Sequence, residues 1–345
     1  MYFGHTEKRT FLPSLIGALV CLFFVRSGFL SLFFLVPMGV LAFRYDYRVA
    51  WTGLGIAVLG NTVLALGIAA ALGNSAVGIF WDLLYFTIMV SIFTWISSPP
   101  PGLSLNVSGE VRLIIGSCLG ALLFTGIFFR IIAKPEFAEY IAALSNSLLS
   151  LHLASGSDVV QKALLESLTP DVILNLIKSI MLRGGSLISC VCLFFFCRQI
   201  SSILARFSLR QRRARSPEVN PMMVFYVHPQ VIWVLSGSLL LVVLVRTLKL
   251  ETPEIILWNI LILCAILYFA QGLGILQFFV TRPSMHPFLR LFLYILFIVL
   301  LFSPVINAIL LAGVVLLGIA ENWVPFRASK QNGPPSTPEA GDGGN

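Results

Sequence analysis

The stretch IILWNILILCAILYFAQGLGILQFFV (Ile255–Val280) carries no acidic or basic side chain. It is longer than the ~20 residues that an α-helix needs to cross the hydrocarbon of a bilayer. In an α-helix the backbone N–H and C=O groups form hydrogen bonds with one another. A single segment that crosses hydrocarbon needs these bonds, because no water is there to replace them. The stretch therefore predicts a transmembrane helix, and it sets the class of fold expected for the chain around it.

The composition of the whole chain agrees with this reading. Of the 345 residues, 58% are hydrophobic and only 11% are charged, whereas a soluble domain carries roughly 25% charged residues. Most of the protein surface must then face a medium other than water. The sequence predicts an all-α fold, a polytopic bundle of transmembrane helices in contact with a lipid bilayer.

Apolar runs between charged residues predict about ten spans. The last two could instead form one helix that bends at Ser303 and Pro304, which would give nine. Pro37 interrupts the second run. The predicted spans are Phe11–Val25, Phe29–Phe43, Val49–Leu72, Val77–Ile96, Val111–Ile132, Gly184–Ala205, Val231–Val245, Ile255–Val280, Phe288–Phe302 and Val305–Ala320.

The spans divide the chain into four predicted segments. Residues 1–132 hold five spans, 133–183 form an amphipathic insert outside the cytoplasm, 184–327 hold five more spans, and 328–345 form a disordered tail. Apolar residues recur at steps of three and four in the insert, and Thr169-Pro170-Asp171 predicts the start of its second helix. These helices are expected on the outer membrane surface or over the bundle, where they could also act as a lid over a substrate.

Basic residues predict the orientation in the membrane, because cytoplasmic loops of membrane proteins are rich in Lys and Arg. An even number of spans with both termini in the cytoplasm brings most of the 23 Lys and Arg residues to the inner side. The basic loop Ser208–Pro221 is the strongest such signal, and it also suits attraction to anionic lipid or protein docking. The inner basic residues are Lys8, Arg9, Arg44, Arg48, Arg112, Arg198, Arg206, Arg210, Arg212, Arg213, Arg215, Arg282, Arg290, Arg327 and Lys330.

Polar side chains inside the predicted spans are the candidates for a ligand site, because placing a polar group in hydrocarbon costs free energy and such residues are often functional. Hydrogen bonds between helices would explain the amides, but the glycines beside Gln271 also allow close helix approach or local unwinding, as in transporter sites. Asp82 is either a substrate or proton site, or an acid at the outer interface beside Trp81. The candidate polar core consists of Gln271, Gly272, Gly274, Asn61, Asn259 and Asp82.

The end of the last span is sharply marked in LLGIAENWVPFRASK (Leu316–Lys330). An indole such as Trp323 prefers the headgroup layer. Pro325 is expected to stop the helix, and Arg327 is expected to face the cytoplasm. The boundary motif that we single out consists of Glu321, Trp323, Phe326 and Arg327.

No pattern of catalytic or metal-binding residues accompanies these features. The four histidines are scattered without spacing for a metal, no phosphate-binding loop is present, and no Ser, His and Asp set occurs in a known order. The net charge of +8 is explained by the loops rather than by nucleic acid. The sequence therefore predicts no cofactor, no metal, no catalytic residue and no nucleic-acid partner.

Three stretches carry a resemblance to a known family: YFAQGLGILQFFVTR (Tyr268–Arg282), LGIAENWVPFR (Leu317–Arg327) and FYVHPQVIWVL (Phe225–Leu235). They resemble the YybS-like family of bacterial predicted integral membrane proteins, which has no established activity. Glu321 stands where the family pattern has Asp, and Pro325 where a second acid is common, so a role that needs two carboxylates is not implied. The matching positions are Gln271, Gly272, Leu273, Leu317, Gly318, Glu321, Trp323, Phe326 and Arg327.

The resemblance leaves the function as a set of hypotheses. The general look is similar to membrane-embedded substrate-binding subunits of vitamin transporters and to envelope-assembly proteins, which is an analogy of fold alone. The first hypothesis is therefore small-molecule transport or substrate capture, energised by a partner protein or an ion gradient. Its site would lie among the fifth, eighth and last spans with Gln271 as a ligand, and with Asn61, Asn259 and Asp82 nearby.

The second hypothesis is a scaffold for cell-envelope or membrane-complex assembly, with the basic loop and the insert as docking surfaces. An intramembrane enzyme is a third. The surroundings of Gln271 discriminate between the first two, because a transporter should hold this side chain in a water-accessible polar cavity, whereas a scaffold should pack it dry against another helix.

Overall fold

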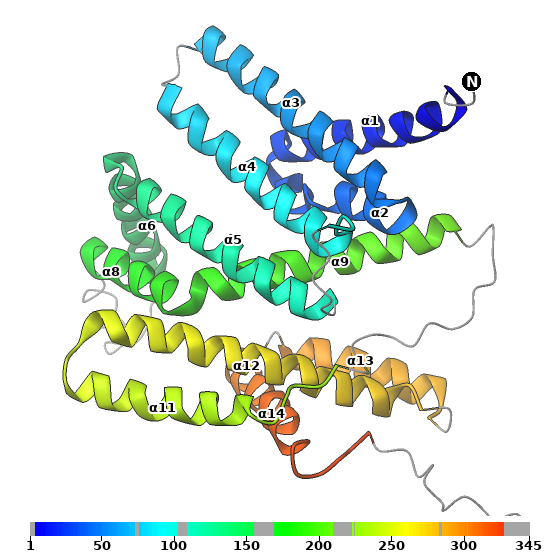
Figure 1. Cartoon of the computed structure of the whole chain (residues 1–345). Helices are drawn as coiled ribbons and strands as arrows, with labels where there is room; N and C mark the ends of the chain where they lie inside the picture. Colours follow the sequence, from blue (N-terminus) through cyan, green and yellow to red (C-terminus); the bar gives the residue numbers. More distant parts are fainter. Residues whose placement is uncertain are drawn as a thin grey trace, which may run out of the picture. The chain divides into compact units, whose positions relative to one another are not determined.

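A computed structural model of the chain describes residues 4–72, 76–102, 109–154, 169–209, 223, 225–282, 285–301 and 303–327. Every regular element in these ranges is a helix, as the sequence predicts. The chain forms two compact units, Met1–Arg215 and Ser216–Asn345 (Figure 1). The basic loop falls almost entirely on residues outside those described, and so does the predicted tail at 328–345.

The first unit packs around a short helix, α2. This helix contacts α1, α3, α4 and α9, and its residues Val36 to Gly39 are buried. Pro37 lies in its first turn, where the missing N–H is not needed. The helices of this unit are α1 (Gly4–Arg26), η1 (Gly28–Phe33), α2 (Val36–Arg44), α3 (Tyr47–Leu72), α4 (Ala76–Ser97), α5 (Gly109–Ile132), α6 (Pro135–Ala154), α8 (Pro170–Ile180), η2 (Met181–Gly185) and α9 (Ser186–Leu209).

The two compact units do not follow the predicted segments 1–132, 133–183 and 184–327. Helix α9 packs along α5 and α2, so a division before residue 184 would separate helices that share one core. Two glycines of α5 show how closely these helices approach: Gly116 lies against Ile96 of α4, and Gly120 lies against Phe194 of α9. The small-residue pair thus contacts two different helices.

The predicted insert contains the two helices that the sequence indicates, α6 and α8, which pack on each other. Thr169 is the N-cap of α8 and its hydroxyl accepts a hydrogen bond from the Val172 N–H at 3.4 Å, with Pro170 and Asp171 in the first turn. This start was predicted from the same three residues, 169–171. One apolar stripe of α8 faces outward, with Val172, Leu176 and Ile180 all exposed.

The second unit is built on α12. It consists of α11 (Val231–Thr247), α12 (Glu251–Val280), α13 (Pro287–Leu301) and α14 (Pro304–Ala320), and α12 packs against both α11 and α14 (Figure 1). Helices α13 and α14 are separate elements, because Ser303 has an extended backbone and Pro304 starts a new helix. The alternative of one bent helix in this region is therefore wrong.

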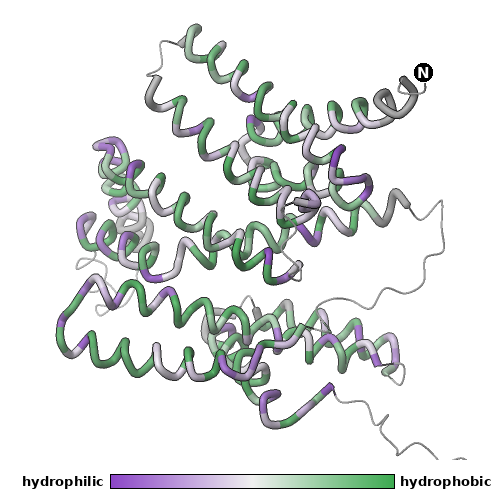
Figure 2. Tube along the Cα trace, viewed as in Figure 1, coloured by the Kyte–Doolittle hydropathy of each residue, from purple (hydrophilic) through white to green (hydrophobic). Residues whose placement is uncertain are grey.

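In the described part of the chain, five helices are long and apolar enough to cross a membrane, by length and composition. Only 22% to 33% of the most apolar window of each is buried, so most of these apolar residues are at least partly exposed. Hydrophobic residues run along the middle of the helices, and hydrophilic ones gather mostly near their ends (Figure 2). These features fit a membrane-embedded protein. The five are Tyr47–Ala71, Gly78–Ser97, Gly109–Ile132, Pro170–Ala205 and Glu251–Val280.

The crossing of α12 and α14 depends on two glycines. A Cβ atom on Gly272 would overlap the carbonyl oxygen of Val314, and a Cβ atom on Gly318 would overlap the carbonyl oxygen of Tyr268. Each glycine thus lets the backbone of one helix touch that of the other, the packing that small residues permit in membranes. Helix α12 runs without a break through Gly272 and Gly274, so the predicted unwinding is wrong, and the predicted close approach is confirmed for Gly272.

Replacing Gly318 by Ala should loosen this crossing. The added methyl group must push α12 and α14 apart, and overpacking of this kind costs about 1–3 kcal/mol. We expect a lower thermal unfolding midpoint for the purified Gly318→Ala protein. Gly313→Ala is the control on the same helix, because nothing lies within 4 Å of a Cβ atom at Gly313. Equal midpoints for the two variants would contradict the glycine crossing.

Candidate functional site

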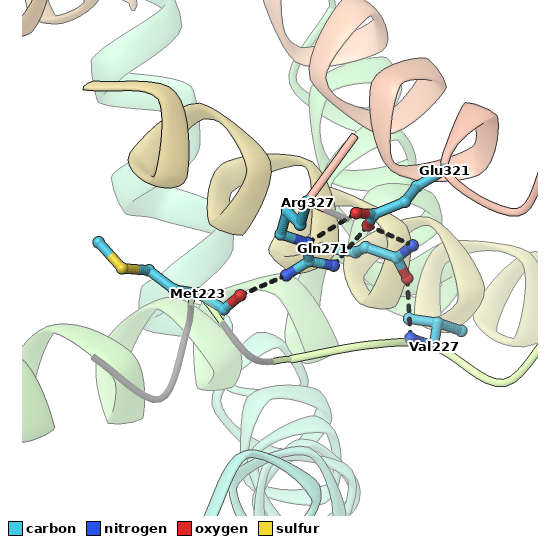
Figure 3. Close-up of polar contacts among 5 residues, drawn as sticks. All are labelled: Met223, Val227, Gln271, Glu321 and Arg327. Atoms are coloured by element: carbon cyan, nitrogen blue, oxygen red, sulfur yellow. Dashed lines mark hydrogen bonds and ion pairs between the residues drawn. The ribbon is translucent and has the colours of Figure 1, made fainter. Parts of the chain in front are cut away.

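Gln271 is the most deeply buried polar side chain of α12, with 0% of its surface exposed. The backbone N–H of Val227 donates to Gln271 Oε1 at 2.8 Å, and Gln271 Nε2 donates to Glu321 Oε2 at 3.0 Å (Figure 3). A buried amide is unfavourable unless it is hydrogen-bonded. These two bonds therefore fix the place of Gln271 in the core of the second unit.

Glu321 is the first residue after α14, and its carboxylate is buried. Arg327 Nε donates to Glu321 Oε1 at 2.6 Å, and Arg327 Nη2 donates to Glu321 Oε2. The two bonds form a bidentate pair, the strongest geometry available to an arginine and a carboxylate. The chain must turn back within six residues for Arg327 to reach Glu321.

This turn corrects two expectations at the boundary motif. Helix α14 ends at Ala320, before Pro325, so the proline does not stop the helix. Arg327 was expected to face the cytoplasm, yet only 12% of its side chain is exposed and it pairs with Glu321. Trp323 is 69% exposed, as an interfacial indole should be. Phe326 is half-buried in the same turn.

The pair also holds the segment that precedes α11. Arg327 Nη1 donates to the carbonyl oxygen of Met223 at 2.8 Å (Figure 3). Together with the bond from Val227 to Gln271, this contact joins three parts of the chain that are far apart in sequence. We call Gln271, Glu321, Arg327 and the backbone of Met223 and Val227 the polar lock.

A second polar contact lies one helical turn away on α12. Tyr268 is fully buried, and its hydroxyl accepts a hydrogen bond from Asn322 Nδ2 at 3.4 Å. Asn322 Oδ1 is also buried and has no hydrogen-bond partner among the described residues. Residues on consecutive turns of α12 thus bond to Glu321 and Asn322, the two residues that follow α14, and this reinforces the turn.

The chemistry of the polar lock is that of a closed and neutral cluster. One carboxylate is matched by one guanidinium, so the lock has no net charge to attract an ionic ligand. All three nitrogen atoms of Arg327 donate to groups of the protein, and both ends of the Gln271 amide are bonded. A buried, fully paired cluster of this kind fixes one arrangement of helices.

The remaining residues of the candidate polar core have separate partners. Gly274 is buried on α12, and Asn259 Nδ2 donates to the Ile255 carbonyl of its own helix at 2.8 Å. Asn61 belongs to the first unit, where it is buried and accepts a hydrogen bond from Arg26 Nη2 at 3.0 Å. This bond joins α1 and α3, as predicted for an interhelical amide.

Asp82 also belongs to the first unit, and its side chain is exposed. Next to it, the Trp81 ring lies 4.9 Å from the guanidinium carbon of Arg130. The fifth predicted span, α5, packs with α4 and α9 of this unit.

Sequence reasoning found Gln271, Glu321 and Arg327 but treated them as two unrelated features, a polar core and a boundary. It missed their connection and the part played by Tyr268 and Val227. The spacing held a signal: Tyr268, Gln271 and Gly272 share one face of a helix, as do Val314, Gly318 and Glu321 on the other. Two matching faces of small and polar residues indicate helices that pack on each other.

No group of three or more His, Cys, Asp or Glu side chains that could hold a metal ion occurs in the described part of the chain. The six cysteines are free thiols. Comparisons of the chain with protein-family models, with curated proteins and with solved structures find no match. The function must therefore be argued from the geometry of the site.

Breaking the polar lock from one side should destabilise the protein. Arg327→Gln leaves the Glu321 carboxylate buried without its partner, which costs about 3 kcal/mol. The double variant Glu321→Gln, Arg327→Gln should lose less than the two single variants together, because it leaves no unpaired charge. Thermal unfolding of the four proteins measures this coupling.

The control for this cycle is Arg246→Gln, at the end of α11, because Arg246 is exposed. Its stability should stay within about 0.5 kcal/mol of the unmodified protein. Strictly additive effects of the two substitutions at Glu321 and Arg327 would show that the pair has no structural role.

Proposed function

We propose that this chain is a multi-pass protein of the bacterial cytoplasmic membrane that serves as a scaffold for cell-envelope or membrane-complex assembly. The observation that carries the proposal is the burial of Gln271 in the polar lock. Its amide is fully buried and is hydrogen-bonded to the Val227 N–H and to the Glu321 carboxylate. A dry amide between helices is what the scaffold hypothesis predicts.

The insert supplies the docking surface of this scaffold. The exposed stripe of α8 contains Val172, Leu176 and Ile180, at steps of four residues. Its neighbour α6 exposes Tyr140 and Leu144. An apolar face on a short amphipathic pair suits contact with the membrane surface or with the helix of a partner protein.

The proposed topology has ten spans, both termini in the cytoplasm and the insert outside. Ten apolar helices among the described residues support it: the five long ones and five shorter ones. The shorter helices are Thr10–Arg26, Leu30–Arg44, Val231–Thr247, Pro287–Phe297 and Ile306–Ala320. The resemblance to the YybS-like family belongs to the same proposal, and the three stretches that carry it each contribute a residue to the polar lock.

Cysteine labelling tests this topology. In a variant without the six native cysteines, we expect Arg48→Cys to react with a membrane-impermeant maleimide only after the cells are opened. Asn175→Cys on α8 should react in intact cells with a permeable outer envelope, since both positions are exposed. Labelling of both from the same side would overturn the orientation and the outer position of the insert.

Ligand screening together with crosslinking tests the scaffold. We expect no compound of a metabolite and vitamin panel to raise the thermal midpoint of the purified protein. A photo-reactive residue at Leu176 should give a discrete protein adduct in cells, whereas one at Leu240, exposed in the middle of α11, should give none. A compound that stabilises the protein, but not its Gln271→Ala variant, would contradict the proposal and favour transport.

Transport or substrate capture is the second candidate, and one observation favours it. The apolar run Pro170–Ala205 is broken at Arg183 and Gly184, where Gly184 is buried with a φ of 113°. Beside the break, the Ser186 hydroxyl bonds to the Met181 carbonyl at 2.8 Å and to the Thr125 hydroxyl at 2.7 Å. Broken helices of this kind line the sites of many transporters.

A further inference from the structure

A cluster of two arginines lies at one end of the first unit, apart from the polar lock. Arg198 of α9 donates from Nη1 to the Gly109 carbonyl at 3.1 Å and lies 3.9 Å from the Glu110 carboxylate. Its side chain is 21% exposed. Arg112 lies on α5 three residues after Gly109, so it shares the helix face that Arg198 contacts. The cluster thus holds two positive charges and one negative charge.

In this cluster, Arg112 has a buried hydrogen-bond donor to which the described part of the chain offers no acceptor. Its Nε atom is buried and has no hydrogen-bond partner among the described residues, although the side chain as a whole reaches the surface. A buried donor without a partner is uncommon in folded proteins and indicates a bound group, ion or water that satisfies it.

Ser97, at the end of α4, supplies a further hydrogen-bond donor near the start of α5. Helices α4 and α5 are neighbours in the chain and pack together, and Gly116 of α5 lies against Ile96 of α4. Arg112 lies one turn before Gly116, so the start of α5 that carries it lies beside the end of α4, where Ser97 is the last residue. The Ser97 hydroxyl is also buried without a partner among the described residues.

We propose that Arg112 and Arg198, together with the Ser97 hydroxyl, bind a phosphate group. The planar guanidinium fork matches the oxygen atoms of a phosphate, and two of them supply the charge that this anion requires. The phosphate belongs either to the headgroup of an anionic lipid or to a phosphorylated compound in solution. The Glu110 carboxylate repels the anion. When the site is empty, this carboxylate balances part of the positive charge of Arg112 and Arg198. The site does not depend on whether the chain is a scaffold or a transporter.

The test is binding to the purified full-length protein, with phosphatidylglycerol, diacylglycerol and inorganic phosphate as probes. Arg112→Gln should bind phosphatidylglycerol about tenfold more weakly, because a charge-assisted bond is lost. Glu110→Gln should bind it more tightly, since a repelling charge is removed. Arg130→Gln is the matched control at the other end of α5, where the guanidinium is already held over Trp81.

The probes separate the two sources of phosphate. Arg112-dependent binding of phosphatidylglycerol alone identifies a lipid headgroup, whereas Arg112-dependent binding of inorganic phosphate identifies a soluble ligand. Equal binding of diacylglycerol, or the same loss in Arg112→Gln and Arg130→Gln, overturns the site. If Arg112→Gln does not fold, Arg112→Lys keeps the charge without the fork and should weaken binding less. Unchanged or weaker binding by Glu110→Gln also overturns the proposal.

Discussion

The bidentate pair between Glu321 and Arg327 can form only where α14 ends and the chain turns back. Its carboxylate also accepts from Gln271 on α12, and the guanidinium also donates to the Met223 carbonyl. The pair therefore determines where three separate segments of the second unit meet. Since burying either charge alone would be strongly unfavourable, the pair favours one arrangement of these segments over others. The rest of the unit depends on this constraint.

Close packing makes the constraint effective. Gly272 and Gly318 bring the backbones of α12 and α14 into contact, and this proximity lets the Gln271 amide reach Glu321. Lipid offers no apolar driving force between helices, so small residues and interhelical hydrogen bonds must supply the association. Where α12 and α14 cross, the small residues and the hydrogen-bonding residues are close in sequence. Gln271 is next to Gly272, and Glu321 is one turn after Gly318. Each kind of residue needs the other.

Arginines of this protein are used in contrasting ways. Arg327 is fully paired within the protein, which suits a fixed structural element. Arg26 likewise bonds Asn61 and joins two helices of the first unit. Arg112 keeps a buried donor without a protein partner, which suits a group that binds something else. The same side chain thus serves packing or recognition according to whether its neighbours satisfy it, and exposure alone does not distinguish these roles.

Much of the fold was predictable because its signals are local. Charge-free runs marked the helices, and Thr169-Pro170-Asp171 marked the start of α8. Pro37 was expected only to interrupt the second run, and α2 begins there. The tertiary structure alone showed that Arg327 turns back to Glu321, that α14 ends before Pro325, and that α9 belongs with α5. These outcomes depend on which side chains meet after the helices pack. The sequence by itself determined where helices form, because a helix depends on its own residues. Only the tertiary structure decided which polar groups share a site, because the partner in a hydrogen bond can lie far along the chain.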